Sequence, residues 1–382
     1  MNMDELRGRI DAVDDELLRC FAERMDIAGD IARYKAEHGL PVLDERRERE
    51  KLYAVSEKAP EELQSYAVSL YALLFELSRS RQNRLLHKQS PLAESIQAAI
   101  EQTPPLFPEK AAVACQGVEG SNSQIACERL FRLPNELYFS SFDAVFNAIE
   151  KGLCRYGVLP IENSYAGDVG AVMDLIFSGS LYINRMIDLE VEHSLLGVPG
   201  TAIEDIETVV SHPQALEQCA DFIRAHGWKT VSYSNTALAA KYVAAAGDKH
   251  IAAIASDETA VLYGLCALAH RINSARSNTT RFAVLSRAQH LPSPESRTGR
   301  EHFILVFTTK NEAGALAQPL NIIGAHNFNM RGLRSRPMKD LIWNYYFFVE
   351  ADGNISTDDG KNMLRELSAV CAELRLAGTY EA

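Results

Sequence analysis

The chain has 382 residues, of which 47% are hydrophobic and 24% are charged, and its formal net charge is −12. This length predicts two or three domains, because one ordinary hydrophobic core does not hold so many residues. The acidic balance argues against general nucleic-acid binding. No apolar run approaches the roughly 18–20 residues that a membrane span needs. An anionic substrate must then be held by locally placed Arg and Lys.

The N-terminus and the cysteines favour a cytoplasmic protein. Residues 1–6 are acidic and open directly into an amphipathic pattern, which is not typical of a signal peptide. The seven cysteines are dispersed and form no Cys-x-x-Cys pair. This distribution favours buried, reduced thiols over disulfides or a zinc site. We therefore expect a cytoplasmic enzyme or sensor.

The first 88 residues predict three amphipathic helices. Apolar residues at three- and four-residue steps run from Leu6 to Ile31 and predict a long helix that ends near Glu37. Gly39 and Pro41 follow its last turn, as is typical of a helix end. A second helix is expected to begin near residue 44 and a third to cover about 61–86. Three such helices bury little surface alone, so we expect a dimer.

Basic residues on the first helix also indicate a second chain. Arg24 and Lys35 are eleven residues apart, which is close to three turns, so they project from one face. Arg7 lies roughly 25 Å from Arg24 along the helix axis and is turned away by about 100°. One straight helix does not aim Arg7 and Arg24 at the same small molecule. Two antiparallel helices from two chains do.

Polar residues on the other two helices stand at unusual positions. Asp44, Arg47 and Glu48 share one face of the second helix, at steps of three and four residues. Ser78 and Gln82 continue the apolar stripe of the third helix, where the pattern calls for apolar side chains. Each residue alone is better explained by a solvated charge run or a helix edge. Together they indicate a binding site.

These residues and the segments 6–7, 22–24 and 41–49 resemble the all-helical chorismate mutases at the N-terminus of bacterial P-proteins, over roughly residues 3–88. The resemblance implies entwined dimers in which each site borrows its first arginine, here Arg7, from the partner. Chorismate rearranges to prephenate without a nucleophile, so catalysis means holding the reactive conformer and stabilising developing charge. The implied roles are carboxylate clamping by Arg7, Arg24 and Arg47, donation to the ether oxygen by Lys35 and Gln82, and support of the ring hydroxyl by Asp44, Glu48 and Ser78.

Residues 89–110 are expected to be a linker. Four prolines interrupt the segment, which has no sustained apolar period. A short helix is expected at 95–101. The domain boundaries are thus 1–88 for the helical module and 111–288 for the segment that follows the linker.

Residues 111–288 predict an α/β domain of two lobes, because buried apolar runs alternate with amphipathic segments. A helix near residue 122 is expected to be capped by Ser121 or Ser123. The chain is expected to leave for a second lobe near residue 190 and to return through 278–282. The expected strands are 111–115, 137–139 and 156–161, and the expected helices are 142–151 and 169–177.

The stretch Asn278–Phe282 organises the rest of this domain. Arg281 and Thr280 stand directly before the apolar run 282–285, which we expect to be a buried parallel strand. An Arg there is a carboxylate fork and a Thr hydroxyl is a hydrogen-bond donor. Further polar residues are expected at carboxyl ends of strands, where open α/β sheets bind ligands. They are Glu162, Asn163, Ser164 and Ser211, with Gln218 one turn into the following helix.

The segments 160–164, 211–214, 262–265 and 278–282 together resemble prephenate dehydratases, whose two-lobed fold is like that of periplasmic binding proteins. The resemblance implies loss of the ring hydroxyl and carbon dioxide from prephenate, giving phenylpyruvate, with Thr280 as the residue on which activity depends most. Thr280 acts on the leaving hydroxyl, and Arg281 with nearby backbone amides holds the carboxylate. Glu162, Asn163, Ser164, Ser211 and Gln218 orient the substrate. Val118 and Asn122 depart from the family pattern and leave open whether prephenate or arogenate is preferred.

Residues 300–382 follow a linker at 291–300 and predict a βαββαβ order, which is a ferredoxin-like topology. Gly314, Ala315 and Leu316 are expected to open its first helix at 313–324, where backbone amides meet a carboxylate. This segment resembles an ACT domain, the module that senses phenylalanine in the same family. The family's Glu-Ser-Arg-Pro is here Arg334, Ser335, Arg336 and Pro337. Arg334 either weakens the effector site, changes its ligand or has no effect.

The sequence thus predicts a multidomain enzyme with an all-α chorismate mutase module, an α/β two-lobed dehydratase and an α+β ACT domain. Its expected partners are chorismate, prephenate, the effector phenylalanine and at least one further copy of the chain. Neither site calls for a metal or an organic cofactor. The alternatives are an arogenate-preferring dehydratase, an inactive dehydratase, and an amino-acid-responsive sensor that binds without conversion.

Overall fold

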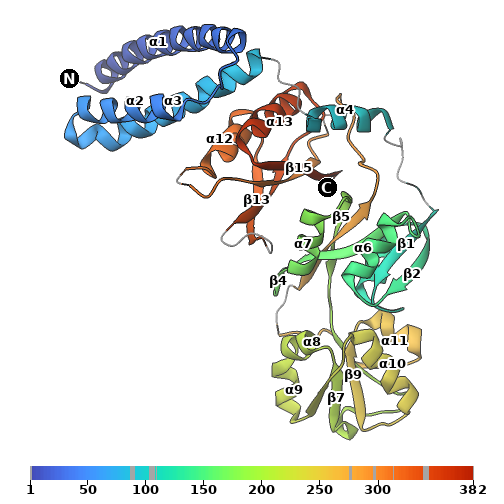
Figure 1. Ribbon diagram of the computed structural model, residues 1–382. Coiled ribbons are helices and arrows are strands. Elements are labelled where there is room, and N and C mark those ends of the chain that lie inside the picture. Colours follow the sequence, from blue (N-terminus) through green and yellow to red (C-terminus); the bar gives the residue numbers. More distant parts are fainter. Residues whose placement is uncertain are drawn as a thin grey trace. The chain divides into compact units, whose positions relative to one another are not determined.

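The computed structural model describes residues 2–86, 91–102, 108, 110–274, 278–295, 298–312, 314–338 and 344–381. Parts of the predicted linker 89–110, together with Ala313 and Trp343 at the starts of two predicted elements, lie outside the described residues. The chain divides into two compact units, and Figure 1 labels their elements. The first unit comprises Met1–Gln97, Phe307–Phe348 and Ile355–Arg375, and the second comprises Ala98–Val306, Val349–Asn354 and Leu376–Ala382.

The helical module contains the three predicted helices: α1 (Met3–Glu37), α2 (Glu45–Lys58) and α3 (Gln64–Leu85), the last preceded by a 3-10 turn at Glu61–Leu63. α1 begins with a capping box between Asn2 and Glu5 and ends before Gly39, whose φ of 64° is in the left-handed region that glycine favours. α1 and α2 both pack on α3. None of the described helices is long and apolar enough to cross a membrane.

α1 leaves much of its apolar stripe uncovered. Leu6, Ile10, Val13 and Leu17 recur at steps of three and four residues, yet each side chain is at least 42% exposed in the described chain. These residues are the ones whose spacing predicts the helix. The partner that the sequence predicts for this face stays a prediction. In the predicted linker, the expected short helix is present and longer, as α4 (Pro91–Gln102).

The first lobe of the second unit is built on a sheet in the order β5-β11-β3-β1-β2. β1 pairs in parallel with β2 and β3, whereas β11 runs antiparallel to both β3 and β5. The prediction of a parallel strand after Arg281 is therefore wrong. Apolar runs that are buried on both faces look alike in either direction, so the sequence pattern does not fix strand direction. The strands are β1 (Lys110–Gln116), β2 (Leu133–Phe139), β3 (Tyr156–Asn163), β5 (Tyr182–Glu190) and β11 (Thr279–Ser286).

Three helices pack on this sheet: α5 (Asn122–Leu130), α6 (Phe142–Glu150) and α7 (Gly170–Ser178). Ser121 is the N-cap of α5 by backbone geometry, but its hydroxyl donates to the Gln116 carbonyl oxygen at 3.3 Å and accepts no capping hydrogen bond from the described first turn of the helix. The predicted loop at 162–167 is shorter than expected, because Glu162 and Asn163 belong to β3. A two-residue strand, β4 (Gly167–Asp168), folds back onto them.

The second lobe has its own five-stranded sheet in the order β10-β6-β9-β7-β8. Its strands are β6 (Ser194–Gly197), β7 (Thr208–Ser211), β8 (Lys229–Ser232), β9 (Ile251–Ala255) and β10 (Cys266–Ala269). Its helices are α8 (Pro213–Gln218), α9 (Ala220–His226), α10 (Thr236–Ala246) and α11 (Asp257–Tyr263), and a 3-10 turn spans Ile203–Asp205. The chain passes between the lobes twice, after β5 and before β11. The prediction of two α/β lobes is confirmed.

The C-terminal segment follows the predicted βαββαβ order, and its strands are neighbours in the order β13-β14-β12-β15. The first helix begins at Ala317, after the turn that contains Gly314, and not at the predicted 313. The elements are β12 (Glu301–Thr308), α12 (Ala317–Ala325), β13 (Met330–Pro337), β14 (Tyr345–Asp352), α13 (Asp358–Val370) and β15 (Glu373–Glu381).

A glycine at the pairing of β15 with β5 gives a test of this packing. Gly378 faces Ile183, and a Cβ atom on Gly378 would overlap the Ile183 carbonyl oxygen. We expect Gly378→Ala to destabilise the second unit by about 1–3 kcal/mol, because the backbone there has to move. Gly324→Ala is the control, since its Cβ meets nothing within 4 Å. Thermal melts of both variants check this, and equal melting temperatures contradict it.

Candidate active sites

In the helical module, the structure brings Arg24 and Ser78 together at the interface of α1 and α3. Nη1 of Arg24 donates to the Leu74 carbonyl oxygen at 2.9 Å and also to Oγ of Ser78. The Ser78 hydroxyl donates in turn to the Leu74 carbonyl oxygen at 2.7 Å. The guanidinium lies 5.6 Å from the ring centroid of Phe75, and burial lowers the pKa of Arg24. Arg24 stays charged, so a fixed positive charge sits beside Ser78.

Gln82 lies one turn after Ser78 and is buried, with 7% of its surface exposed. Its Oε1 has no hydrogen-bond partner in the structure. Because buried side-chain polar atoms are usually satisfied, an orphaned amide oxygen marks a place for a ligand or a water. The two ends of a carboxamide are assigned from hydrogen bonds, so Gln82 is able to present either a donor or an acceptor here.

The other predicted mutase residues are engaged locally. Nζ of Lys35 donates to the Val42 carbonyl oxygen at 2.6 Å, and Asp44 caps α2 by accepting from the Arg47 amide at 3.0 Å. The Arg47 side chain is exposed. Arg7 is exposed as well, and Nη1 of Arg7 lies 3.6 Å from Oδ1 of Asp4. The structure therefore does not bring Arg7 to Arg24 within one chain.

Glu48 pairs with Arg79, which the sequence analysis missed. Arg79 Nη1 donates to both carboxylate oxygens of Glu48, and this ion pair ties α2 to α3. Glu48 therefore already has a partner, although the predicted role for it is to hold a ring hydroxyl. Arg79 stands in a run of charged residues near the end of α3, and no local spacing singles it out.

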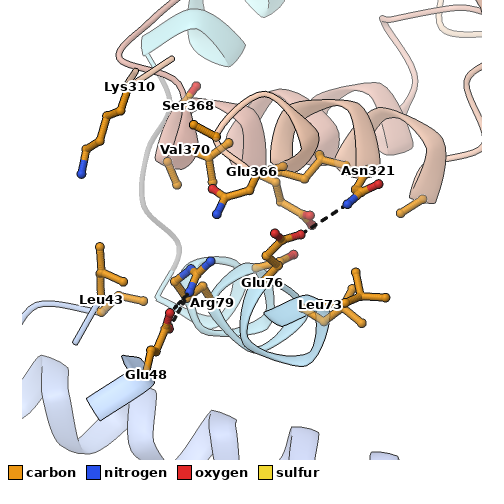
Figure 2. Close-up of a pocket in the computed structure, with 18 of the residues that line it drawn as sticks. Leu43, Glu48, Leu73, Glu76, Arg79, Lys310, Asn321, Glu366, Ser368 and Val370 are labelled. Atoms are coloured by element: carbon orange, nitrogen blue, oxygen red, sulfur yellow. Dashed lines mark hydrogen bonds and ion pairs between the residues drawn. The ribbon is translucent and has the colours of Figure 1, made fainter. Parts of the chain in front are cut away.

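A cavity of about 1130 Å³ lies in the first unit and is lined from α2, α3, α12 and α13. Figure 2 shows the Glu48–Arg79 pair, which joins α2 to α3, and a hydrogen bond of 3.5 Å that Asn321 of α12 donates to Glu76 of α3. Burial raises the pKa of Glu76. Of the predicted site residues, only Glu48 and Ala315 line this cavity, so it is separate from the pair of Arg24 and Ser78.

In the two-lobed domain, the register of β3 against β11 brings Asn163 beside Thr280 and Glu162 beside Arg281. Directly opposed residues of paired strands point to the same face, and successive residues point to opposite faces. Asn163 and Thr280 therefore share one face of the sheet, and Glu162 and Arg281 share the other. Because β11 is antiparallel, its first residues lie next to the last residues of β3.

The Asn163 carboxamide has a determined orientation. Its Oδ1 accepts hydrogen bonds from the backbone amides of Tyr165 and Ala166, at 3.0 and 2.9 Å. The amide nitrogen must then point the other way, where it donates to Oγ1 of Thr280 at 2.8 Å and to Oδ1 of Asn278 at 2.9 Å. Because Thr280 accepts from Asn163, its own hydroxyl hydrogen remains available to a substrate.

Arg281 does not form the predicted carboxylate fork beside Thr280. Its Nε donates to Oδ1 of Asp188 at 2.9 Å, and its Nη1 lies 3.7 Å from Oε1 of Glu350. The bond to Asp188 raises the pKa of Arg281, so the guanidinium is held as a cation by two protein carboxylates. Alternation along β11 sends it to the face opposite Thr280. Contact of both side chains with one small substrate therefore stays a prediction, which the pairing of Arg281 in this structure does not favour.

The remaining predicted residues have different surroundings. Ser211 ends β7 as predicted, but its hydroxyl is fully buried and donates to the Ile254 carbonyl oxygen at 2.6 Å. Ser164 is exposed, and its Oγ accepts from the Thr279 amide at 2.9 Å. Gln218 is buried in α8, where its Oε1 accepts from Asn278 at 3.1 Å, while its Nε2 has no partner. Asn278 thus links Gln218 to Asn163.

The predicted regulatory residues lie in a turn and a strand. Gly314 has a φ of 83°, and the Ala315 amide already donates to the Glu312 carbonyl oxygen at 3.2 Å. Leu316 is the N-cap of α12, so these residues precede the helix instead of opening it. Arg334 lies in β13, with its guanidinium 5.8 Å from the ring centroid of Phe348. Ser335, Arg336 and Pro337 complete the same strand.

Two family models match this chain, one over the helical domain and one over the two-lobed domain. Residues 6–83 match the model for chorismate mutase type II, and residues 113–290 match the model for prephenate dehydratase. The bifunctional chorismate mutase/prephenate dehydratase of Escherichia coli (strain K12) is 31% identical over 388 residues, which cover 98% of this chain and 95% of that protein. The chain belongs to this family of bifunctional enzymes. The predicted family and both enzyme classes, an isomerase and a lyase, are confirmed.

The dehydratase domain has further relatives. Arogenate dehydratase/prephenate dehydratase 1 of Arabidopsis thaliana is 32% identical over 286 residues, which cover 71% of this chain and 72% of that protein. The solved structure of prephenate dehydratase from Arthrobacter aurescens, in complex with L-Phe, is 26% identical with a TM-score of 0.65. It covers 71% of this chain and 90% of that one. The two-lobed fold of the dehydratase domain is thus shown.

The oriented carboxamide of Asn163 predicts a specific loss. In Asn163→Asp the shape is kept, but an acceptor faces Oγ1 of Thr280 and Oδ1 of Asn278, where a donor stood. We expect dehydratase kcat to fall by roughly 100-fold or more, as in removal of a positioned donor. Chorismate mutase activity of the same chain is the internal control and should be unchanged. Near-normal phenylpyruvate production by the variant contradicts the assigned orientation.

Proposed function

We propose that the helical domain converts chorismate to prephenate and that the two-lobed domain converts prephenate to phenylpyruvate. The observation that carries the second step is the hydrogen bond from Asn163 to Thr280, which leaves the Thr280 hydroxyl hydrogen to the substrate. The first step is supported by the half-buried cation of Arg24 beside Ser78 and by the unsatisfied Oε1 of the buried Gln82 carboxamide. The matched family models support both assignments.

In the mutase step, the protein has only to hold the compact conformer and stabilise charge on the breaking ether bond. Arg24 supplies a fixed guanidinium for one carboxylate, and Gln82 turns its amide nitrogen to the ether oxygen. Lys35 releases the Val42 carbonyl to become the second donor. Arg47 is an exposed cation at the start of α2, and we assign it to the other carboxylate.

In the dehydratase step, Thr280 passes its hydroxyl proton to the ring hydroxyl, which leaves as water, and Oγ1 of Thr280 takes a proton back from solvent. The bond between the ring and its carboxylate carbon breaks, and carbon dioxide leaves. The electron pair of that bond enters the ring, and the ring becomes aromatic. Since Arg281 is held on the other face by Asp188, the donors for the substrate must come from the side of Thr280. Gln218 supplies one, because its buried Nε2 has no partner in the described structure.

We further propose that the chain forms at least a dimer through α1 and that residues 300–382 are an ACT domain responsive to phenylalanine. The uncovered apolar stripe of α1 and the distant Arg7 support the first proposal. The βαββαβ order supports the second, together with the L-Phe complex of the Arthrobacter aurescens relative. Size-exclusion chromatography with light scattering tests the dimer. Repeating the dehydratase assay with added phenylalanine tests the effector.

Removal of the Thr280 hydroxyl separates the two activities. We expect Thr280→Ala to lower dehydratase kcat by about 100-fold or more, where 100-fold is the lower end of the usual range for a proton donor, while prephenate accumulates from chorismate. Thr280→Ser keeps a hydroxyl and should retain much of the activity. A coupled assay that follows chorismate and phenylpyruvate measures both steps. If the unmutated chain leaves prephenate untouched, arogenate is the next substrate to assay.

Because the Gln82 side chain is neutral, we predict how mutase activity depends on pH. A carboxamide does not titrate, so mutase activity of the unmutated chain should not require acid. In Gln82→Glu, the buried carboxyl must be protonated to donate, and burial raises a carboxyl pKa. We expect mutase kcat of this variant to fall as the pH rises through that pKa and to recover in acid. A pH profile that matches the unmutated chain would refute the donor role of Gln82.

A further inference from the structure

A continuous chain of side-chain hydrogen bonds leads from the Asn163 turn to a buried histidine. Asn163 donates to Asn278, Asn278 donates to Oε1 of Gln218 at 3.1 Å, and Nε2 of His193 lies 2.9 Å from the same oxygen. These four side chains are each at least 92% buried. His193 belongs to none of the elements that carry the predicted site residues.

The donor and the acceptor of every hydrogen bond in this series follow from the orientation of the Asn163 carboxamide. Backbone amides fix the position of Oδ1 of Asn163, so Nδ2 of Asn163 faces Asn278. The atom of Asn278 that accepts from this nitrogen must be Oδ1. Nδ2 of Asn278 then points at two acceptors, the Val191 carbonyl oxygen and Gln218. The atom of Gln218 that receives it is therefore Oε1. The facing nitrogen of His193 must carry the hydrogen.

His193 thus has a defined state, a ring that donates through Nε2. Burial lowers the pKa of His193, which favours the neutral form of this tautomer. Its backbone is fixed too, because its amide donates to Oδ1 of Asn273 at 2.8 Å and its carbonyl accepts from Ile272 at 2.9 Å. The ring is held where it donates to Gln218.

Two donors on Oε1 leave Gln218 a single orientation. A glutamine carboxamide with one donor at its oxygen can turn about its last bond, but His193 and Asn278 approach that oxygen together. Nε2 is forced to the opposite side, where it is buried and has no hydrogen-bond partner among the described residues. Buried donors are normally satisfied, so this nitrogen is placed for a group that the protein itself does not supply.

We propose that His193 and Asn278 are positioning residues for the dehydratase reaction. They hold the Gln218 carboxamide so that Nε2 donates to an oxygen of the substrate, on the side of the sheet from which Thr280 acts. This proposal rests on the proposed dehydratase function and adds the residues that aim its donor. Neither residue touches the reacting atoms.

The same bonds join the two lobes. Gln218 belongs to the second lobe and Asn163 to the first, while His193 and Asn278 lie in the two segments by which the chain passes between them. Asn273 strengthens this connection by donating to the Val191 carbonyl oxygen at 3.2 Å. A purely structural tie between the crossing segments is the competing explanation, and the test must separate the two.

The test uses four variants of the full chain, with mutase activity as the internal control for folding. His193→Leu removes the donor, whereas His193→Gln keeps an amide donor at nearly the position of the ring Nε2. Gln218→Leu removes the carboxamide, and the fourth variant combines His193→Leu with Gln218→Leu. Dehydratase kcat and KM, melting temperature and prephenate affinity by titration calorimetry are measured for each.

We expect His193→Leu to lower dehydratase kcat/KM by roughly 10- to 100-fold, as misplacement of a positioning group does. His193→Gln should recover most of this loss. The double variant should be no worse than Gln218→Leu alone, since residues that act through one another are not additive. The proposal is overturned if His193→Leu lowers only the melting temperature, or if the two single losses multiply in the double variant.

The proposed function and this inference fail in different ways. If the unmutated chain does not convert prephenate, the proposed function is refuted, whatever the variants show. Calorimetry still decides the inference in that case, because a donor aimed by His193 contributes to binding. Weaker prephenate binding in His193→Leu, recovered in His193→Gln, then supports it, and equal affinities in all three proteins reject it.

Discussion

Two backbone amides that follow β3 fix the oxygen of Asn163, and the chemistry of the dehydratase domain depends on that constraint. A carboxamide has a donor end and an acceptor end, so fixing one end fixes what the other offers. The nitrogen is thereby assigned to Thr280, whose hydroxyl is left to donate. The turn that supplies these amides is closed by the short strand β4, which pairs with the end of β3.

The pairing of β11 with β3 is what places Thr280 next to the oriented Asn163 carboxamide. β11 returns from the second lobe antiparallel to β3, so the start of one strand lies beside the end of the other. Polar residues that are more than 110 positions apart in the sequence therefore meet on one face. The same alternation separates Thr280 from Arg281, which forms ion pairs on the opposite face. The cation next to Thr280 in the sequence holds the sheet together there and does not face the substrate donors.

The helical domain uses charge in a different way. Its half-buried guanidinium, Arg24, donates to the Leu74 carbonyl and to the Ser78 hydroxyl, which are neutral groups and not carboxylates. Glu48 is instead neutralised by Arg79, which ties two helices. An isomerase that handles a dianion needs the first kind of arginine, because a guanidinium already paired with a carboxylate has little left to offer. The two arginines lie in helices that pack on each other and have different partners: neutral groups for Arg24 and a carboxylate for Arg79.

The sequence by itself determined the helices, most strand positions and the family. Hydrophobic period is a local property, and it predicted the long helix α1 and its end near Glu37, whereas the helix begins three residues before the apolar pattern. It also placed Asn163, Gln218 and Thr280 among the candidates. What only the tertiary structure decided is direction and partnership: that β11 is antiparallel, that Arg281 pairs with Asp188, that Glu48 pairs with Arg79, and that His193 reaches Gln218. A lone histidine after a strand carries no local signal. Its role arises from hydrogen bonds between residues distant in sequence, and such bonds form only when the chain brings both partners to one place.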